Sequence, residues 1–322
     1  MSLSEQLADF GYGAGWAAIR HLPDPLARKA FDLGGGLAAR GGGPEQLRRN
    51  LARVLATTPD AVPDELMAAS MRSYARYWYE AFRLPSMDFA EAAANVIITD
   101  DEIARFEAEV DKGKGLIFAL PHSGNYDMAG VWLVQHCGTF ATVAERLKPE
   151  SLFRKFVDYR ESLGFEIFPL SGGEQPPFEA LAERLRAGKI ICLMGERDLN
   201  ARGVPVTMFG ERTRMPAGAA KLALETGAAL MPVHHWFMDG AKSRLQTFEP
   251  LDVSGGVAAT TQRLADVFAA NIADHPADWH MLQPFWESDW SPERRARLAQ
   301  ADAEAANGAH TDGAQDGRGV SS

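Results

Sequence analysis

A histidine and an aspartate lie five positions apart in the segment Pro121-His122-Ser123-Gly124-Asn125-Tyr126-Asp127. An apolar run, 115–120, precedes this segment and an amphipathic helical pattern follows it, which predicts a strand, a loop and a helix in that order. Open α/β sheets place their functional sites at such junctions. An imidazole held there by a carboxylate has one nitrogen of raised basicity, so the pair predicts a general base.

The spacing of His122 and Asp127 decides how their side chains can meet. Inside one helix, five steps of 100° would place them about 140° apart, facing away from each other. His122 is therefore expected before the helix, with Ser123 or Asn125 as the cap and Asp127 in the first turn. From there Asp127 is expected to accept a hydrogen bond from one imidazole nitrogen, leaving the other as the base. The alternative is a capping histidine followed by an ordinary helix-start aspartate.

No protein nucleophile is evident beside this pair. The sequence has no Gly-x-Ser-x-Gly elbow and no cysteine with a plausible partner, and Ser123 is expected to cap the helix. A base without its own nucleophile suits direct attack by a substrate hydroxyl on an activated acyl group. Backbone amides at the helix start are expected to receive the oxyanion, so one-step acyl transfer is the predicted chemistry.

A second group of charges, Gly195-Glu196-Arg197-Asp198, follows the apolar run 190–194. If the strands are parallel, this group lies at the same sheet edge as His122. Glu196 and Asp198 can then bind sugar or alcohol hydroxyls, or stabilise the imidazolium. The alternative is a solvated turn, the usual fate of such a run of charges.

Six short apolar runs alternate with amphipathic helical stretches from about residue 95 onward. Runs of this kind are typical of a central, mostly parallel sheet with helices on both faces. They cover residues 96–98, 116–120, 140–144, 165–168, 190–194 and 229–233. Residues 1–90 form a predicted helical N-terminal portion, including an aromatic-rich helix over 63–84. We expect an α/β fold with a single domain, residues 1–298, followed by a disordered tail, 299–322.

Charge and composition exclude several classes of protein. Lys and Arg number 33 against 43 Asp and Glu, a formal charge of −10, which argues against nucleic acid as a partner. Two cysteines cannot build a disulfide framework, so a reducing, cytosolic setting is expected. No apolar run approaches the roughly 18 residues of a spanning helix. A metal site is not expected, because His-Glu-x-x-His spacing is missing and neighbouring His234 and His235 would point to opposite faces of a strand.

The N-terminal helices offer a way to approach a membrane. Residues 3–22 place apolar side chains at helical spacing, flanked by Tyr12 and Trp16. Up to Thr58 the chain carries five acids and seven bases, a charge of +2 in an otherwise acidic protein. Bases beside exposed aromatic rings are what an interfacial helix uses on anionic headgroups. The alternative is a helix whose apolar stripe only caps the protein's own core.

The His-x4-Asp motif formed by His122 and Asp127 resembles the mark of the lysophospholipid and lipid A acyltransferase superfamily. Further residues that match this superfamily follow it: Glu145, Arg160 with Gly164, Glu196 with Asp198, the segment 204–210, and Pro216 with Gly218. The chain is more closely similar to the phosphatidylinositol mannoside acyltransferases. That likeness extends from 11–16 through 43–48 and 74–78 to 279–284, and leaves out the tail.

This resemblance implies a peripheral enzyme at the cytoplasmic face of the plasma membrane, in contact with its anionic surface. The enzyme would move a fatty acyl chain from acyl-CoA to a mannose hydroxyl of a phosphatidylinositol mannoside. By resemblance, His122 deprotonates the hydroxyl, Asp127 orients His122 and Glu196 holds the sugar near the base. The implied substrate-binding residues are Glu145, Arg160 and Asp198. An apolar tunnel for the acyl chain is implied, and no cofactor or metal besides acyl-CoA as donor substrate.

The residues leave two other functions open. One is an acyltransferase that acts on a lipid A precursor or a lysophospholipid, because the His-x4-Asp motif does not separate these acceptors. The other is a non-catalytic membrane lipid-binding protein that keeps the His-Asp pair only for its structure.

Overall fold

The structure is a computed structural model that describes residues 19, 22–146, 150–173, 175–198 and 203–300. The helix predicted over 3–22 and the tail predicted over 299–322 lie almost wholly outside the described residues. The aromatic rings of Tyr12 and Trp16 lie outside them too.

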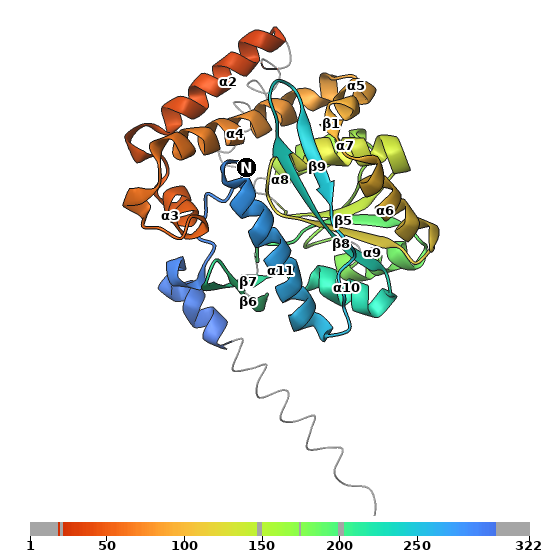
Figure 1. Cartoon of the computed structure of the whole chain (residues 1–322). Helices are drawn as coiled ribbons and strands as arrows, with labels where there is room; N and C mark the ends of the chain where they lie inside the picture. The colour runs from red at the N-terminus through yellow and green to blue at the C-terminus, as the bar shows by residue number, and fades with distance from the viewer. Residues whose placement is uncertain (1–18, 20–21, 147–149, 174, 199–202, 301–322) are drawn as a thin grey trace, which may run out of the picture.

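Helices make up the described N-terminal portion, as the sequence predicts. They are α2 (Asp24–Ala38), α3 (Glu45–Val54), α4 (Asp64–Arg83) and α5 (Phe89–Ala94). Helix α2 continues through Gly34-Gly35-Gly36 and lies along α4 (Figure 1). A Cβ atom at Gly35 would come within 2.7 Å of the main-chain oxygen of Met71, so the glycine permits this close approach of α2 to α4.

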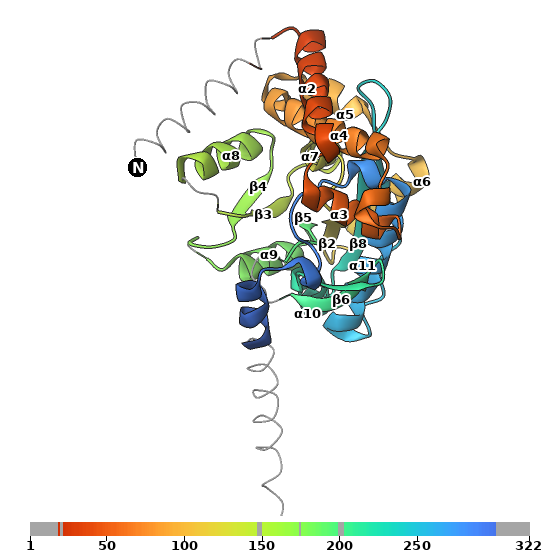
Figure 2. The ribbon, with the colours of Figure 1, turned by 90° about the vertical axis from the view of Figure 1, so that its left-hand side faces the viewer.

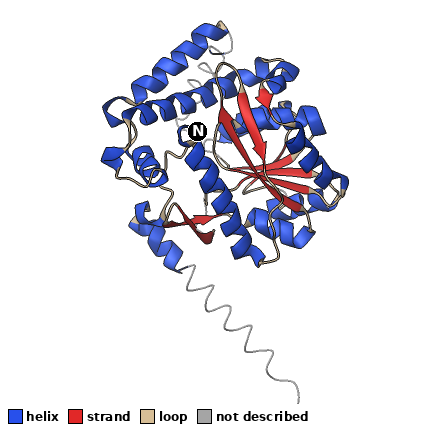
Figure 3. Cartoon of the chain, in the orientation of Figure 1, coloured by secondary structure: helices blue, strands red, loops and turns tan. Residues whose placement is uncertain are grey.

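A seven-stranded sheet forms the centre of the protein, in the order β1-β9-β8-β2-β5-β3-β4 (Figure 3). Its strands are β1 (Val96–Ile97), β2 (Leu116–Leu120), β3 (Ala141–Ala144), β4 (Glu166–Pro169), β5 (Ile190–Met194), β8 (Ala229–Phe237) and β9 (Ser243–Thr247). All neighbouring pairs are parallel except β8 with β9, so the predicted mostly parallel α/β sheet is confirmed. The six predicted runs correspond to β1, β2, β3, β4, β5 and β8.

Helices cover both faces of this sheet (Figure 2). Side chains of β2 alternate between the two layers: Leu116, Phe118 and Leu120 face one core, and Ile117 and Ala119 face the other. The helices of the first core are α6 (Asp100–Asp111), α7 (Tyr126–Cys137) and α8 (Glu150–Ser162). Those of the second are α9 (Pro177–Arg186), α10 (Gly218–Thr226) and α11 (Gly256–Asp274).

A separate hairpin and the C-terminal segment complete the second core. The hairpin consists of β6 (Val204–Met208) and β7 (Glu211–Met215). Trp286 is fully buried against it and donates its indole N–H to the main-chain oxygen of Met208, at 3.1 Å. The same segment returns to the loop after β2, where the N–H of His280 donates to the main-chain oxygen of His122, at 2.8 Å. The C-terminal segment therefore supports the loop that carries the histidine.

Candidate active site

His122 is bound to Glu196, a residue from the neighbouring strand. Strands β2 and β5 are parallel and pair Leu120 with Met194, so their carboxyl ends lie side by side. The loops that follow bring Nδ1 of His122 to 2.7 Å from Oε1 of Glu196. The same oxygen accepts the main-chain N–H of His122, at 2.5 Å. The predicted placement of both charged groups at one sheet edge is confirmed.

This contact determines which imidazole nitrogen can act as a base. Glu196 is fully buried, and an ionised carboxylate only accepts hydrogen bonds. Nδ1 of His122 must therefore carry the proton of the neutral ring, which leaves the lone pair on Nε2. The imidazole itself keeps 29% of its surface exposed, so a substrate can approach it.

The predicted hydrogen bond between Asp127 and His122 is wrong. Within the described residues, the Asp127 carboxylate is bound instead by Arg160 of α8, whose Nε lies 2.9 Å from Oδ1 and Nη2 3.4 Å from Oδ2. The Tyr77 hydroxyl lies 3.5 Å from the second oxygen. The reason for the difference is that Glu196 already occupies Nδ1, while the guanidinium provides a full counter-charge for a carboxylate that is 2% exposed.

The Asp127–Arg160 pair is buried at the start of α7. Burial lowers the pKa of the Arg160 guanidinium, but the charge of Asp127 outweighs this effect and raises the pKa well above its ordinary value. Arg160 is therefore a permanent cation whose charge is balanced inside the protein. The hydroxyls of Tyr77 and Tyr126 lie 2.5 Å apart beside this pair, and the ring of Tyr126 meets that of His122 edge to face with 5.9 Å between centroids.

Asn125, one of the two predicted caps, begins helix α7. Its Oδ1 accepts the main-chain N–H groups of Asp127 and Met128, both at 3.1 Å. Gly124 before it has a φ of 59°, and a Cβ atom there would come within 2.3 Å of Nδ1 of His235. Only glycine fits this turn without strain. His122 and Asp127 therefore lie on opposite sides of a sharp, capped turn.

The predicted oxyanion site of backbone amides is largely wrong, because most of these amides already have acceptors. The N–H of His122 donates to Glu196, that of Ser123 to the oxygen of Pro121, and that of Gly124 to the oxygen of Asp278. Those of Asn125, Asp127 and Met128 donate to side-chain atoms. Among the N–H groups of residues 122–128, that of Tyr126 alone has no acceptor within the described residues.

Two of the predicted substrate-binding residues lie away from the imidazole. Glu145 is exposed directly after β3, at the same sheet edge but beyond β5. Asp198 is 7% exposed and accepts the main-chain N–H of Gly203 at 3.0 Å. Its main-chain oxygen accepts from Arg294, at 2.7 Å. Among the six predicted site residues, the structure thus joins His122 with Glu196, and Asp127 with Arg160.

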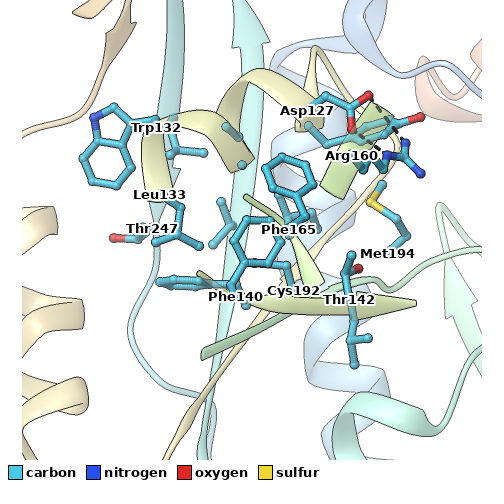
Figure 4. Close-up of a pocket in the computed structure, with 18 of the residues that line it drawn as sticks. Asp127, Trp132, Leu133, Phe140, Thr142, Arg160, Phe165, Cys192, Met194 and Thr247 are labelled. Carbon is cyan, nitrogen blue, oxygen red and sulfur yellow. Dashed lines mark hydrogen bonds and ion pairs between the residues drawn. The ribbon is translucent and has the colours of Figure 1, made fainter. Parts of the chain in front are cut away.

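An apolar pocket opens beside the Asp127–Arg160 pair (Figure 4). Figure 4 shows Asp127 and Arg160 at one end and Trp132 at the opposite side, with the rings of Phe140 and Phe165 between them. The cavity has a volume of about 80 Å³, which is narrow compared with the sites of drug-sized ligands. Its walls are otherwise mostly hydrophobic, so it suits a long apolar group whose polar end lies near Tyr126, the ring that contacts His122.

Several residues of the site carry no local signal in the sequence. Glu80 and Tyr77 of α4 contact Asn125 and Asp127, respectively. His235 of β8 accepts the N–H of Asn125 at 2.8 Å, and burial lowers its pKa to about 3, so it is neutral at pH 7. His280 is also neutral, because burial and the nearby His122 lower its pKa to about 3. The i, i+4 spacing of Arg76 and Glu80 is the one pattern that could have indicated their ion pair, and it does not indicate the contact with Asn125.

Two features are absent from the described residues. Among the described residues, no three histidine, cysteine or acidic side chains are grouped so that they could hold a metal ion. Across the same residues, no helix combines the length and apolar character that crossing a bilayer requires. His234 and His235 point to opposite faces of β8, as expected: His234 contacts Trp236 and His235 contacts Phe237.

Comparison with known proteins identifies the family of this chain. A model of the bacterial lipid A biosynthesis acyltransferases matches residues 2–288. A protein of Mycolicibacterium smegmatis named phosphatidylinositol mannoside acyltransferase is 61% identical over 297 residues, which are 92% of this chain and 97% of that protein. A protein of the same name from Mycobacterium tuberculosis (strain CDC 1551 / Oshkosh) is 59% identical over 298 residues, 92% and 94% of the two chains. The chain belongs to the bacterial lipid A biosynthesis acyltransferase family.

Proposed function

We propose that this protein transfers a fatty acyl chain from acyl-CoA to a mannose hydroxyl of a phosphatidylinositol mannoside. The observation that carries the proposal is the buried Glu196 carboxylate on Nδ1 of His122, whose ring contacts Tyr126 in the wall of an apolar pocket. A base of defined tautomer and a site for an acyl chain are the two parts that such a transfer needs. The names of the two relatives support phosphatidylinositol mannoside as the acceptor.

In the proposed reaction, Nε2 of His122 takes the proton of the acceptor hydroxyl while its oxygen attacks the thioester carbon. Glu196 stabilises the imidazolium that forms, because its carboxylate remains at Nδ1. The N–H of Tyr126 is available to the oxyanion of the tetrahedral intermediate. As the carbon–sulfur bond breaks, the imidazolium returns the proton to the thiolate. The products are an ester and CoA, with no acyl-enzyme.

The contacts of Glu196 change the role proposed for it. A carboxylate that is fully buried and holds both the ring and the main chain of His122 is committed to the base. We therefore propose that Glu196, rather than Asp127, orients His122. Asp127 and Arg160 neutralise each other at one end of the pocket, where they hold α7 and α8 together.

The apolar pocket is the proposed site of the acyl chain. It lies between the sheet and the helices α6, α7 and α8, and its wall includes Cys192 and Met194 of β5, the strand that leads to Glu196. An acyl chain in this pocket would have its thioester at the polar end, next to Tyr126 and His122. Burial of the chain would supply binding energy at about 0.8 kcal/mol per methylene group.

Helix α2 supports the proposed peripheral contact with a membrane. Leu26, Leu33 and Leu37 are 59%, 57% and 54% exposed, and their spacing of seven and four residues places them on one face of α2. Lys29 and Arg40 are exposed on or next to the same helix. A helix with an outward apolar stripe and basic neighbours is suited to the interface of an anionic bilayer.

Reaction of the purified protein with palmitoyl-CoA and phosphatidylinositol mannoside tests the proposal. Release of CoA, measured with a thiol reagent, together with an acyl-mannosyl product in the mass spectrum, is the expected result. His122→Ala should fold but release CoA only at the background rate. Normal turnover by this variant would contradict the mechanism.

The same assay separates the alternatives. Transfer to a lipid A precursor or a lysophospholipid, with none to the mannosylated lipid, would replace the acceptor and keep the chemistry. Vesicle binding without CoA release from any acceptor would favour a non-catalytic lipid-binding protein.

A further inference from the structure

We propose that Glu80 is a positioning residue for acyl transfer, which fixes the side-chain amide of Asn125 and, through it, the turn between His122 and Asp127. The inference rests on the proposed function, and it adds a residue of α4 that touches neither substrate. It follows from the hydrogen bonds on the two carboxylate oxygens of Glu80.

Glu80 is a buried carboxylate with two different partners. Its side chain is 5% exposed. One oxygen lies 2.7 Å from Nε of Arg76, one turn earlier on α4. The other accepts from Nδ2 of Asn125, at 2.9 Å. Arg76 also donates to the main-chain oxygens of Met238 and Lys242 in the β8–β9 turn, so the carboxylate is held in place from its other side.

The partner of Glu80 caps the helix of the site. Asn125 is fully buried, and its Oδ1 accepts the N–H groups of Asp127 and Met128. A side-chain amide can adopt either of two orientations that differ little in shape. Because a carboxylate accepts only, Glu80 selects the orientation in which Nδ2 faces it and Oδ1 faces the helix. The reverse orientation would place oxygen against oxygen and amide protons against amide protons.

This selection acts on both residues of the His-x4-Asp motif. Asn125 lies between them, and its own N–H is held by Nδ1 of His235, at 2.8 Å. The turn is thus attached to α4 through the side chain and to β8 through the main chain. If the amide turned, the first turn of α7 would lose its cap, and Asp127 and the loop of His122 would move. Displacements of about 1 Å at a reacting group can cost about 100-fold in rate.

A purely structural role for Glu80 is the competing explanation, since Arg76 would lose its counter-ion whichever role is correct. An exchange of partners separates the two. In Glu80→Gln, the charged Arg76 should retain the amide oxygen, because its hydrogen bond is the stronger one. The amide protons of the new glutamine then face those of Asn125. The Asn125 side chain therefore loses the hydrogen bond that fixed its orientation. In the double variant Glu80→Gln/Asn125→Asp, the new amide donates to the new carboxylate, whose other oxygen caps α7. The total charge of the group is unchanged.

The experiment measures kcat, KM for palmitoyl-CoA and the melting temperature of four proteins: wild type, Glu80→Gln, Asn125→Asp and the double variant. We expect each single variant to lose kcat about tenfold or more, with KM changed less than about twofold. The double variant should regain about tenfold over either single variant. Glu65→Gln, an exposed position on the same helix, serves as the control and should retain wild-type kcat.

Three results would overturn the inference. They are wild-type kcat in Glu80→Gln, a double variant no better than Asn125→Asp, and a loss confined to the melting temperature. If Asn125→Asp does not fold, Glu80→Gln and the double variant still decide the outcome. An inactive wild type would contradict the proposed function instead. In that event, the melting temperatures still test the contact between Glu80 and Asn125. If the shifts of the two single variants add up to the shift of the double variant, the contact is contradicted.

Discussion

Nδ1 of His122 and Oε1 of Glu196 lie 2.7 Å apart, although 74 positions separate the two residues in the sequence. The same oxygen accepts the main-chain N–H of His122. One buried carboxylate oxygen therefore fixes both the orientation of the ring and the conformation of the loop that carries it. The pairing depends on the parallel registration of β2 with β5, which places the two loops side by side.

Replacing Glu196 with Gln should lower kcat for acyl transfer by about 100-fold or more, because a neutral amide does not stabilise the imidazolium and can select the wrong tautomer. Steady-state kinetics with palmitoyl-CoA measure the change. Glu179→Gln, an exposed position on α9, is the matched control and should leave kcat unchanged. A Glu196→Gln variant with nearly normal kcat would assign the orientation of His122 to another group.

Replacing Arg160 with Met should lower the free energy of unfolding by about 3 kcal/mol, because it leaves the Asp127 carboxylate buried without its counter-ion. Urea denaturation measures this loss. Adding Asp127→Asn should restore much of it, since the buried charge is then removed. Arg154→Met is the control: its side chain is 76% exposed beside Glu150, and a change within about 0.5 kcal/mol is expected. Equal losses in the two arginine variants would contradict a buried pair.

Cys192→Phe should reduce the use of long acyl donors more than short ones. Cys192 lines the apolar pocket, so a phenyl ring there occupies space that a long chain needs (Figure 4). We expect kcat/KM for palmitoyl-CoA to fall about tenfold relative to octanoyl-CoA, a difference worth about two buried methylene groups. The short donor is the internal control for the chemical step. An equal loss with both donors would indicate that the chain binds elsewhere.

Leu26→Ser combined with Leu33→Ser should weaken binding to anionic vesicles about tenfold or more, because two outward side chains of α2 lose their apolar contact. Sedimentation with vesicles of phosphatidylcholine and phosphatidylinositol measures the binding. Leu224→Ser on α10 is the control, since Leu224 is 40% exposed on a helix of the second core. Unchanged binding in the α2 variant would leave membrane contact to other parts of the chain.

The stability of the protein should fall below about pH 6.5 because of histidines that are buried without charge. Burial, and secondarily His275, lower the pKa of His234 to about 3. The unfolded chain binds a proton near pH 6.5, whereas the folded protein binds it only near pH 3. The stabilisation is therefore complete above pH 6.5 and is lost as the pH falls towards 3, by about 1.4 kcal/mol per pH unit.

The variant His234→Phe tests this pH dependence. Urea unfolding at pH 8, 6 and 5 measures the free energy of unfolding of the variant and the wild type. Between pH 6 and 5 this free energy should fall less steeply in the variant, because its unfolded chain takes up about one proton fewer. At pH 8 the two proteins should have the same pH slope. Equal slopes at acid pH would show that His234 binds a proton in the folded protein as readily as in the unfolded chain.

The sequence predicted the parts of the fold that depend on local pattern. Continuous apolar runs located β2 and β5 to the residue, and the Asn and Ser before α7 identified its start. Strand β9 was not predicted, because Ser243–Thr247 contains a single apolar residue, Leu245, among four polar ones. The β6–β7 hairpin was missed for a similar reason, since β7 carries three charged residues.

The sequence did not predict which partners meet across the fold. Asp127 was assigned to His122 because the two are close in the chain, but Arg160 and Tyr77, 33 and 50 positions away, surround its carboxylate. Glu196 could be placed at the same edge as His122, yet its contact depends on β5 being the direct neighbour of β2. No local pattern gives that strand order, because β3 and β4 come between them in the sequence.

The tautomer of His122 decides whether Nε2 can act as the general base. Nitrogen-15 NMR of the histidine-labelled protein at pH 8, assigned with His122→Ala, reports which ring nitrogen carries the proton. Our expectation is a protonated Nδ1 and an unprotonated Nε2 in the wild type, with this preference weakened in Glu196→Gln. A proton on Nε2 in the wild type would contradict it, because the nitrogen facing the substrate would then have no lone pair with which to accept the hydroxyl proton.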